Sequence, residues 1–315
     1  MRFSHEDEFR TDASIESSRV NRPRSETGYS AVVLYYKRGT EVTLTLDDLQ
    51  RQRLAPTEIV VVDNGSRDGV IASIEHLYPG ITFVSSRSNL GYSGGMRLGI
   101  EALHAPTEWV ALLTHEVRFA PDLATELLAS TDEGTAAVGP LLSLPSAPTS
   151  IWSAGGTFTK CGQARHHSTV LSSKPYVVEW LDGCALFIRR QFITTGLFDE
   201  RYFLYWDDVD ICTTLSRSGS VKLCPSALAT QDTATSPVYY SARNQILYWR
   251  KWGVKTAVVA ALVRAAVKIL VRDMPGGRRG WAIGRQRGLG VVDGMKGAIR
   301  SFGTLEREIG NGVVN

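Results

Sequence analysis

Three aspartates stand close together in the stretch FLYWDDVDIC, residues 203–212. Asp207, Asp208 and Asp210 have aromatic neighbours there, and unpaired carboxylates are costly in apolar surroundings. They could cap a helix, hold a metal ion or accept a proton. Because a helix start needs one carboxylate for capping, three are more than capping requires, and capping is the favoured interpretation for Asp210.

Polar groups also follow the apolar run EIVVVD, residues 58–63. An acid at the carboxyl end of a buried strand lies where open α/β sheets bind ligands, so Asp63 could accept hydrogen bonds from a base or a ribose. The sequence Asp63-Asn64-Gly65-Ser66 is equally good turn chemistry. After the first apolar run, YYKRGTE has one glycine, which excludes the GxGxxG turn of a dinucleotide-binding dehydrogenase.

A glycine-rich stretch, NLGYSGGMRLGI, covers residues 89–100. Gly91, Gly94 and Gly95 permit close approach of a ligand to the backbone, and we expect a helix to begin after Gly95 with free amides that favour anions. Tight packing of a helix on a strand explains the same glycines equally well.

The arrangement of apolar runs predicts an α/β protein with parallel strands. Expected strands at 31–36, 58–63, 81–86 and 109–114 alternate with helical stretches, one of them at 42–52. Beyond Pro140 we expect a loop (143–150), a hairpin or irregular insert (151–180), a strand (183–190), a helix (207–219), a strand (220–225), a helix (241–272) and a tail rich in glycine and arginine. His166 and His167 fall in the insert, where a solvated pair is the default interpretation.

Composition is that of an ordinary globular protein. Of 315 residues 43% are hydrophobic, and the net charge of +3 gives no sign of nucleic-acid binding. No apolar run approaches the roughly 20 residues of a membrane-spanning helix. The polar start, residues 1–28, does not resemble a signal peptide and is predicted to be a disordered lead-in. Four cysteines without a CxxC pair indicate a reducing, cytoplasmic setting.

Six ordered stretches together resemble the family 2 glycosyltransferases of the GT-A fold, especially their rhamnosyltransferase-like branch. They are VVLYYKR, EIVVVDNGSRDG, SNLGYSGGMRLGI, WLDGCALFIRR, GLFDERYFLYWDDVDI and YYSARNQILYWRKWG. The resemblance implies a Rossmann-like, mostly parallel central sheet flanked by helices, over residues 29–253. A nucleotide-sugar half (29–140) would precede an acceptor half (141–240), and a C-terminal helical extension and tail would cover 254–315.

The activity that this resemblance implies is an inverting transfer from a UDP- or dTDP-linked sugar to an acceptor hydroxyl. The acceptor could be a glycan, a lipid-linked intermediate or a small natural product. Asp208 would be the general base, with Asp207 raising its proton affinity by like-charge repulsion. The alternative is a catalytically inactive sugar-nucleotide-binding protein on the same fold.

The resemblance also implies a site. Donor-binding residues would be Tyr36, Arg38, Asp63, Asn64, Gly91, Gly94, Gly95, Arg97, Thr114, His115 and Glu116. Acceptor-binding residues would be Trp180, Asp182, Gly183, Tyr205 and Trp206, although Trp180 could equally belong to the core.

Both metal positions of the family are altered here. Relatives carry an aspartate after the fourth strand, where LLTHEV supplies Glu116, and a histidine six residues after the proline of a PxA segment, where PSALATQ supplies Gln231. Glu116 can still hold Mg²⁺ or Mn²⁺, with His115 as a further ligand. A metal-independent enzyme, with a cation such as Arg97 balancing the pyrophosphate, is the open alternative.

One helical stretch, from Ala257 to Val271, carries a basic stripe. Arg264, Lys268 and Arg272 recur every four residues on an otherwise apolar segment. We expect its apolar face to pack on the core or a second subunit, which allows a homodimer, with the basic stripe in solvent. The alternative is peripheral contact with an anionic membrane at its inner face.

Overall fold

The computed structural model describes residues 28–231, 237–298 and 300. The predicted lead-in, apart from Gly28, and the end of the tail (299 and 301–315) lie outside the described residues. Within the described part, no helix is both long and apolar enough to cross a bilayer.

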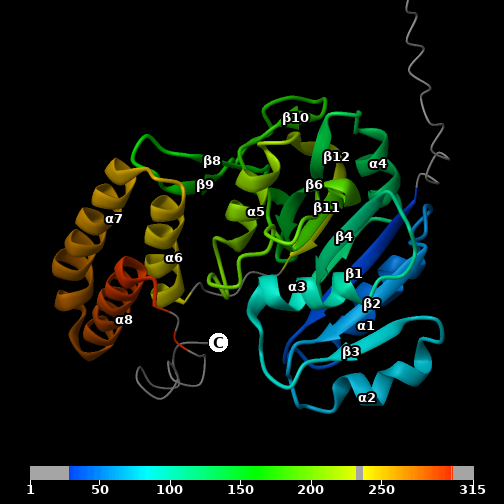
Figure 1. The fold of residues 1–315 in the computed structure, drawn as a ribbon, viewed down its shortest axis with the longest axis horizontal. Helices are drawn as coiled ribbons and strands as arrows, with labels where there is room; N and C mark the ends of the chain where they lie inside the picture. Colours follow the sequence, from blue (N-terminus) through cyan, green and yellow to red (C-terminus); the bar gives the residue numbers. More distant parts are fainter. Residues whose placement is uncertain (1–27, 232–236, 299, 301–315) are drawn as a thin grey trace, which may run out of the picture.

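A ten-stranded, mostly parallel sheet forms the centre of the molecule (Figure 1). Its main path runs β10-β12-β6-β11-β4-β1-β2-β3, with β5 paired to β12 and β7 to β6. The strands of the first half are β1 (Tyr29–Tyr35), β2 (Glu58–Asp63), β3 (Thr82–Ser85), β4 (Trp109–Thr114) and β5 (Val117–Phe119). Strands β1 to β4 pair in parallel, which confirms the predicted α/β class.

Helices cover both faces of this sheet, which explains why its strands are continuous apolar runs. Side chains of β1 alternate between two cores: Val32 packs with Met96, whereas Val33 packs with Leu46. The helices are α1 (Glu41–Gln50), α2 (Val70–Ile74), α3 (Gly91–Glu101), α4 (Leu123–Ala129) and α5 (Asp207–Leu215). The helices α3 and α5 share one core, and α1, α2 and α4 share the other.

The second half differs from expectation where a loop was predicted. Residues 143–150 instead belong to a hairpin of β6 (Thr135–Leu144) and β7 (Ala147–Ser153). Proline and serine occupy its turn, at positions 145 and 146. A turn was therefore predicted at the right place, but the predicted loop was too long. Next come β8 (Gly156–Phe158) and β9 (Ala164–His166), a predicted hairpin, and then β10 (Tyr176–Val177), β11 (Ala185–Arg189) and β12 (Ser220–Gln231).

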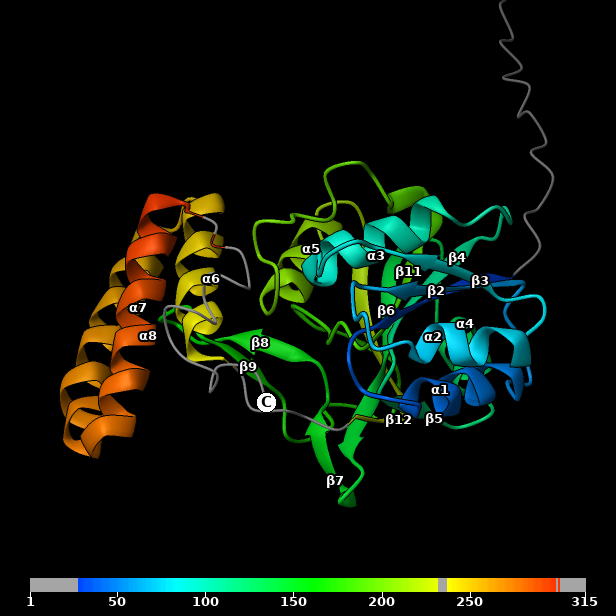
Figure 2. The same ribbon diagram turned by 90° about the horizontal axis from the view of Figure 1, so that it is seen from below.

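Three helices at the C-terminal end stand beside the sheet as a separate layer (Figures 1 and 2). The single helix predicted for 241–272 is wrong, because Gly253, at φ 73°, separates α6 (Val238–Lys251) from α7 (Lys255–Lys268). A short π-helical turn and a 3₁₀ turn then lead to α8 (Gly277–Lys296).

The helix α8 was not predicted, because glycine is a poor helix former. Its glycines have a packing role: a Cβ on Gly290 would lie 2.5 Å from the Tyr239 carbonyl oxygen, and one on Gly294 would lie 2.7 Å from that of Arg243. The glycine row therefore lets α8 approach the backbone of α6 more closely than larger residues would allow.

Candidate functional site

The carboxyl ends of three parallel strands meet at one edge of the sheet. Strand pairing places Tyr35 opposite Asp63 and Leu34 opposite Thr114. The Thr114 amide donates to the Cys184 carbonyl oxygen at 3.0 Å, which brings the segment before β11 to the same edge. Four stretches that the sequence singles out therefore converge there.

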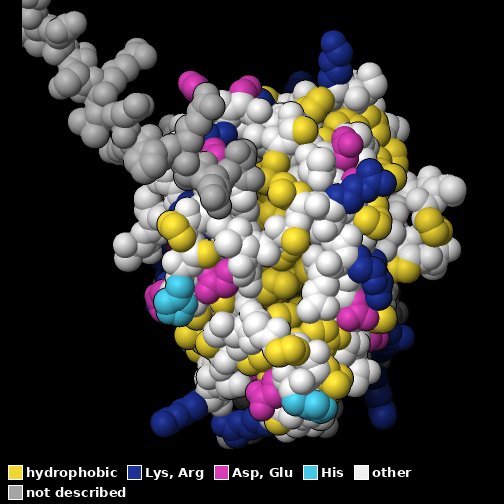
Figure 3. Space-filling model, turned by 90° about the vertical axis from the view of Figure 1, so that its right-hand side faces the viewer, with side chains coloured by type: hydrophobic (Ala, Val, Ile, Leu, Met, Phe, Trp, Pro, Cys, Tyr) yellow, Lys and Arg dark blue, Asp and Glu magenta, His cyan; other side chains and the backbone are white. Residues whose placement is uncertain are grey.

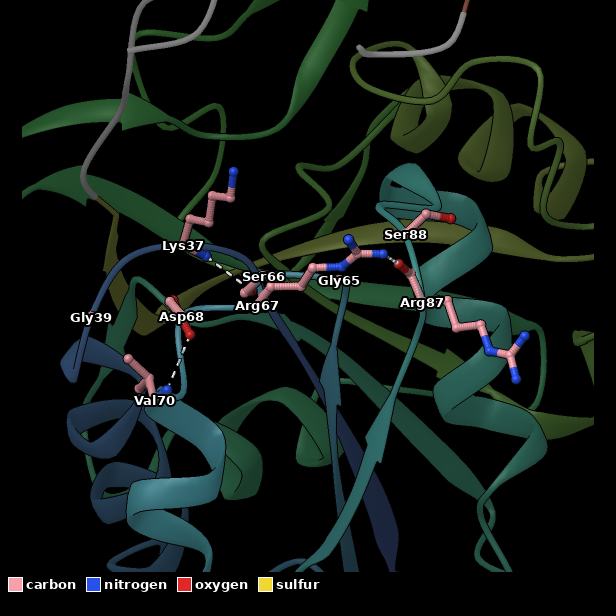
Figure 4. Close-up of a pocket in the computed structure, with 9 residues that line it drawn as sticks. All are labelled: Lys37, Gly39, Gly65, Ser66, Arg67, Asp68, Val70, Arg87 and Ser88. Carbon is pink, nitrogen blue, oxygen red and sulfur yellow. Dashed lines mark hydrogen bonds between the residues drawn. The ribbon is translucent and has the colours of Figure 1, made fainter.

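A polar cavity of about 800 Å³ opens beside the ends of β1 and β2 (Figure 4). Three cations line it, Lys37, Arg67 and Arg87, together with Gly65 and Ser66. The Arg67 guanidinium donates to the Arg87 carbonyl oxygen at 2.6 Å, and the Lys37 amide donates to Ser66 Oγ at 3.2 Å. Sequence reasoning named Tyr36 and Arg38 on either side of Lys37 but overlooked these three cations.

Asp63 shapes the turn below this cavity. Its Oδ1 accepts a hydrogen bond from the Ser66 amide at 2.9 Å. Tyr36 and Arg38 are half-buried in the loop after β1, where the Lys37 ammonium lies 5.2 Å from the centre of the Tyr36 ring. The turn interpretation of Asp63 thus has a direct structural basis, alongside its place at the carboxyl edge of the sheet.

The glycine stretch is used for packing. The helix α3 begins at Gly91, so the predicted start after Gly95 is wrong. A Cβ on Gly91 would lie 2.3 Å from the Phe203 carbonyl oxygen, and one on Gly95 would lie 2.4 Å from Leu34. Gly94 is buried in the same helix.

The amides at the start of α3 have internal acceptors. The Leu90 amide donates to Asn64 Oδ1 at 2.9 Å and the Gly91 amide to Asn89 Oδ1 at 2.8 Å. The Asn64 amide group in turn donates to the Gly91 carbonyl oxygen. The expectation of free amides for an anion does not hold at these positions.

Arg97 lies on the outer side of α3. Its guanidinium pairs with Glu101 at 2.7 Å and Glu200 at 2.6 Å, and it lines a separate cavity of about 640 Å³.

A second cavity at the sheet edge, of about 600 Å³, collects most of the other candidates. Its lining residues include Tyr92, Thr114, Glu116, Trp152, His166, Trp180, Asp182, Gly183, Tyr205, Trp206, Asp207, Asp208 and Gln231. Thr114 and Glu116, predicted to bind the donor, therefore line the same space as the paired aspartates and the predicted acceptor residues.

The two aspartates open α5 after an unusual loop. Trp206 has a positive φ of 69° and directly precedes Asp207. Asp208 Oδ1 accepts from the Val209 amide at 2.8 Å, and its Oδ2 accepts from the Gly183 amide at 3.3 Å. Asp207 is 5% exposed, and its Oδ2 has no hydrogen-bond partner among the described residues.

Both carboxyl groups hold protons more tightly than an exposed aspartate. Burial raises the pKa of Asp207, and the charge of Asp208 raises it further. Burial also raises the pKa of Asp208; the charge of Asp182 adds to the rise, and the amides of Val209 and Gly183 offset part of it. The charge of Asp182 thus acts on Asp208 in addition to the like-charge repulsion between Asp207 and Asp208.

The comparisons with known proteins agree with this geometry. Residues 30–193, more than half of the chain, match the family model described as glycosyl transferase family 2. The chain belongs to this family. The N-acetylglucosaminyl-diphospho-decaprenol L-rhamnosyltransferase of Mycobacterium tuberculosis is 26% identical to this glycosyltransferase over 226 residues, which cover 62% of the chain and 73% of the relative. The galactofuranosyltransferase GlfT1 of the same organism is 30% identical over 60% of the chain and 64% of its own length.

Solved structures give the fold. GalNAc-T7 with UDP, GalNAc and Mn²⁺ superposes with a TM-score of 0.59 at 13% identity, covering 91% of this chain and 57% of that one. The mannosyltransferase PcManGT of Pyrobaculum calidifontis, in complex with GDP-Man and Mn²⁺, superposes with a TM-score of 0.54 at 13% identity. The match covers 85% of this chain and 86% of that one. The predicted GT-A fold is confirmed.

The two altered metal positions face each other in this glycosyltransferase. Burial alone would raise the pKa of Glu116, but hydrogen bonds from His115 and Gln231 and the charge of Arg38 outweigh it and lower that pKa. Gln231 Oε1 and Thr114 Oγ1 are buried without a hydrogen-bond partner among the described residues. An ionised carboxylate beside unpaired oxygens fits a hard divalent cation that also binds donor phosphates.

His115 does not line this cavity. Its Nδ1 lies 3.0 Å from the Leu34 carbonyl oxygen and its Nε2 lies 2.9 Å from Glu116 Oε2. No group of three or more His, Cys, Asp or Glu suited to a metal occurs in the part of the chain that the structure describes.

His166, which sequence reasoning discounted, also lines this cavity. It lies between Trp152 and Trp180, at ring-centre distances of 4.8 and 4.9 Å. Its Nε2 lies 2.8 Å from Asp182 Oδ1, and Ser153 Oγ donates to Asp182 Oδ2 at 2.5 Å. Burial opposes its charge, but Asp182 and Asp208 raise the pKa of His166. The tryptophans and Asp182 were visible in the sequence, yet nothing there indicated that the hairpin folds back onto them.

The sequence suggested that Asp210 caps the helix, but its side chain has a different role. It is almost fully buried and accepts from Lys251 Nζ at 2.6 Å and Trp252 Nε1 at 2.9 Å. This interaction ties α5 to the end of α6.

Proposed function

We propose that this glycosyltransferase moves a sugar from a UDP- or dTDP-linked donor to an acceptor hydroxyl, with inversion at the anomeric carbon and Asp208 as the general base. The observation that carries the proposal is a shared cavity: the Asp208 carboxylate, with its raised pKa, and Glu116, at the end of the donor-side strand β4, line the same space. A donor across the sheet edge would thus have a proton acceptor within the same cavity.

The donor nucleotide would lie along the ends of β1, β2 and β4. Lys37, Arg67 and Arg87 surround the first cavity, where cations suit a diphosphate and the polar edges of a base. Asp63 and Tyr36 stand at the same edge and would hold the base and ribose. Arg38, whose charge acts on Glu116, would face the pyrophosphate.

Direct displacement needs a base, because a sugar hydroxyl is a weak nucleophile at neutral pH. The acceptor oxygen would form a bond to the anomeric carbon while the bond from that carbon to the phosphate oxygen breaks. The hydroxyl proton would pass to Asp208, and the nucleoside diphosphate would leave. Amides of Val209 and Gly183 hold the carboxylate in position, and the raised pKa matches it to proton transfer near neutral pH.

The acceptor would occupy the aromatic part of the cavity. Trp180, Tyr205 and Trp206 offer faces for a sugar ring, and the His166–Asp182 pair offers polar groups beside Asp208. One relative's name specifies a diphospho-decaprenol acceptor, which makes a lipid-linked sugar one candidate here.

A divalent cation would be held by Glu116 with Gln231, and by donor phosphates. When bound, it would supply positive charge that stabilises the departing diphosphate. Its affinity would be modest, because the protein contributes one charged ligand.

The test is a panel of sugar nucleotides with the purified protein, read out as nucleoside diphosphate release and as calorimetric binding. Asp208→Asn is expected to lower turnover by at least about 100-fold, the usual contribution of a positioned base, while donor affinity stays the same. An undiminished rate would remove Asp208 as the base. Tight donor binding without turnover of any sugar nucleotide, with every acceptor class supplied, would support the inactive binding protein instead.

A further inference from the structure

The outer face of α7 and of the turn that follows it is apolar and open. Val259, Val263 and Val267 are spaced four residues apart, so they lie on one side of the helix, and Leu270 and Val271 continue the row. Their exposed fractions run from 52% at Val267 to 72% at Val271. The helix packs inward through Ala257, Ala261 and Ala265 instead, and Val258 also packs against the core, so the expectation of a packed apolar face holds for this inner side and not for the outer row.

The charges around this row have one sign. Residues 255–298 contain nine Lys and Arg against two Asp. Both aspartates are buried: Asp273 pairs with Arg287 at 2.7 Å and Asp293 pairs with Arg300 at 2.5 Å. Seven of the cations are exposed, namely Lys255, Lys268, Arg272, Arg278, Arg279, Arg285 and Lys296. Every exposed charge on this segment is therefore positive.

An aromatic side chain stands near the start of α8. Trp281 is 59% exposed, and together with Ile269, Met274 and Arg285 it lines a mostly apolar cavity of about 550 Å³. A tryptophan next to arginines is the combination that settles at the boundary between lipid headgroups and acyl chains.

The opposite end of the molecule has a different surface. There, basic and acidic side chains are interspersed around scattered apolar ones (Figure 3). The chain as a whole carries a net charge of +3, so the excess of cations on α7 and α8 is local and is not a property of the entire surface.

We propose that the lipid-facing surface, defined as Val259, Val263, Val267, Leu270, Val271 and Trp281 with their surrounding cations, docks on an anionic membrane. Apolar side chains would enter the headgroup region, and the cations would bind lipid phosphates. Charge decides between a membrane and a second copy of the chain, because a two-fold dimer across this surface would bring like charges together.

This surface is linked to the catalytic cavity through one hairpin. Arg264 donates to the Cys161 carbonyl oxygen at 2.8 Å, and Trp249 Nε1 donates to that of Gly162 at 2.7 Å. Both acceptors lie at the tip between β8 and β9, and β9 ends at His166 in the cavity. The proposal does not rest on the transfer reaction, although docking would bring a lipid-borne acceptor to the enzyme.

The test is sedimentation of the full chain with phosphatidylcholine vesicles, with and without phosphatidylglycerol. We expect binding to the anionic vesicles alone, weakened by salt. Reversing Arg272 and Arg279 to Glu should lower the affinity by about five-fold or more for each cation, and Leu270→Asp with Val271→Asp should abolish binding. Leu77→Asp and Arg53→Glu, at exposed positions on the sheet domain, are the matched controls.

Three results would overturn the proposal: no binding to anionic vesicles, equal binding to both kinds, or unchanged binding of the variants at positions 270, 271, 272 and 279. A dimer in solution that the same variants dissociate would assign the surface to a second copy. Binding of the soluble donor by all these variants should match that of the unmodified protein, so failure here is distinct from failure of the proposed transfer.

Discussion

Asn244 holds the backbone of Tyr205. Its side-chain amide, fully buried on α6, donates at 2.8 Å to the carbonyl oxygens of Tyr205, Leu204 and Tyr202. The same loop contains three non-glycine residues with positive φ: Phe203 at 64°, Tyr205 at 65° and Trp206 at 69°. Such conformations are strained and persist where surrounding contacts fix them, so Asn244 positions the loop that delivers Asp207 and Asp208.

Asn244→Asp tests this positioning role. A carboxylate cannot donate to three carbonyl oxygens, so the loop should relax and turnover should fall by at least about ten-fold, while donor affinity changes little. Arg250→Ala is the control, because its guanidinium bonds α8 at the Gly294 carbonyl oxygen, away from the loop. Equal kcat values for Asn244→Asp and the unmodified enzyme, measured at saturating donor and acceptor, would refute the role.

The pH–rate profile should respond to Asp182. A base works when deprotonated, so activity falls as pH drops through the raised pKa of Asp208, at a pH above the value of about 4 for a free aspartate. Because the charge of Asp182 contributes to that rise, Asp182→Asn should move the acidic limb of kcat to lower pH. Glu179→Gln, in the neighbouring hairpin contact with Thr157, should leave the limb in place. A limb that does not move would argue against coupling between the two carboxylates.

Asp207 should reduce stability at neutral pH. Its folded pKa lies above the unfolded value of about 4, so the penalty of burying a charge grows as pH rises above about 4 and is complete above the folded pKa. Asp207→Asn removes this penalty and keeps an oxygen for the Asp208 amide. We expect the melting temperature to rise by roughly 2–4 °C at neutral pH and not at acidic pH. A drop at neutral pH would contradict this account.

Periodicity and turn chemistry predicted the sheet half of the fold well. The strand β2 was predicted with its bounds at Glu58 and Asp63, and the end of β4 at Thr114 also agrees. These segments are buried on both faces, so their residue types reflect their structure locally. The helix α8 could not be predicted in this way, because its glycines are explained by the backbone of α6, which no local pattern reveals.

The residues of the candidate site likewise fall into those that the sequence indicated and those that it did not. Thr114, Glu116 and Asp208 were predicted through the resemblance to family 2 glycosyltransferases, which could be applied because each of them follows or begins an element with a clear pattern. His166 and Asn244 were missed because their roles depend on contacts between segments: Asn244 bonds a loop some 40 residues earlier in the chain. The residue types of FLYW, residues 203–206, likewise give no indication of the strained φ angles in that loop.

His166 should affect the acceptor more than the donor. His166→Phe retains a ring between Trp152 and Trp180 and loses the interaction with Asp182, so we expect a higher acceptor KM, with donor affinity unchanged. The variant would also lose a charge-assisted hydrogen bond from His166 to the acceptor, worth about 1.5–3 kcal/mol, which corresponds to a rise in KM of roughly ten-fold or more. His167→Ala, at the next position, is the control. Initial rates over a range of acceptor concentrations give the answer, and equal KM values would exclude His166 from the acceptor site.

Metal affinity should follow the ligands at positions 116 and 231. Glu116→Gln removes the one charged ligand, so Mn²⁺ should no longer strengthen binding of the nucleoside diphosphate. Gln231→His adds a nitrogen ligand and should increase the Mn²⁺ effect roughly ten-fold, which corresponds to about 1.4 kcal/mol. Gln191→His, at an exposed position, controls for histidine as such. Calorimetry of all four proteins with the nucleoside diphosphate, in the presence of Mn²⁺ or of a chelator, measures the effect. If the chelator does not change nucleoside diphosphate affinity in either the unmodified protein or Gln231→His, the pyrophosphate is bound by cations such as Arg38 without a metal.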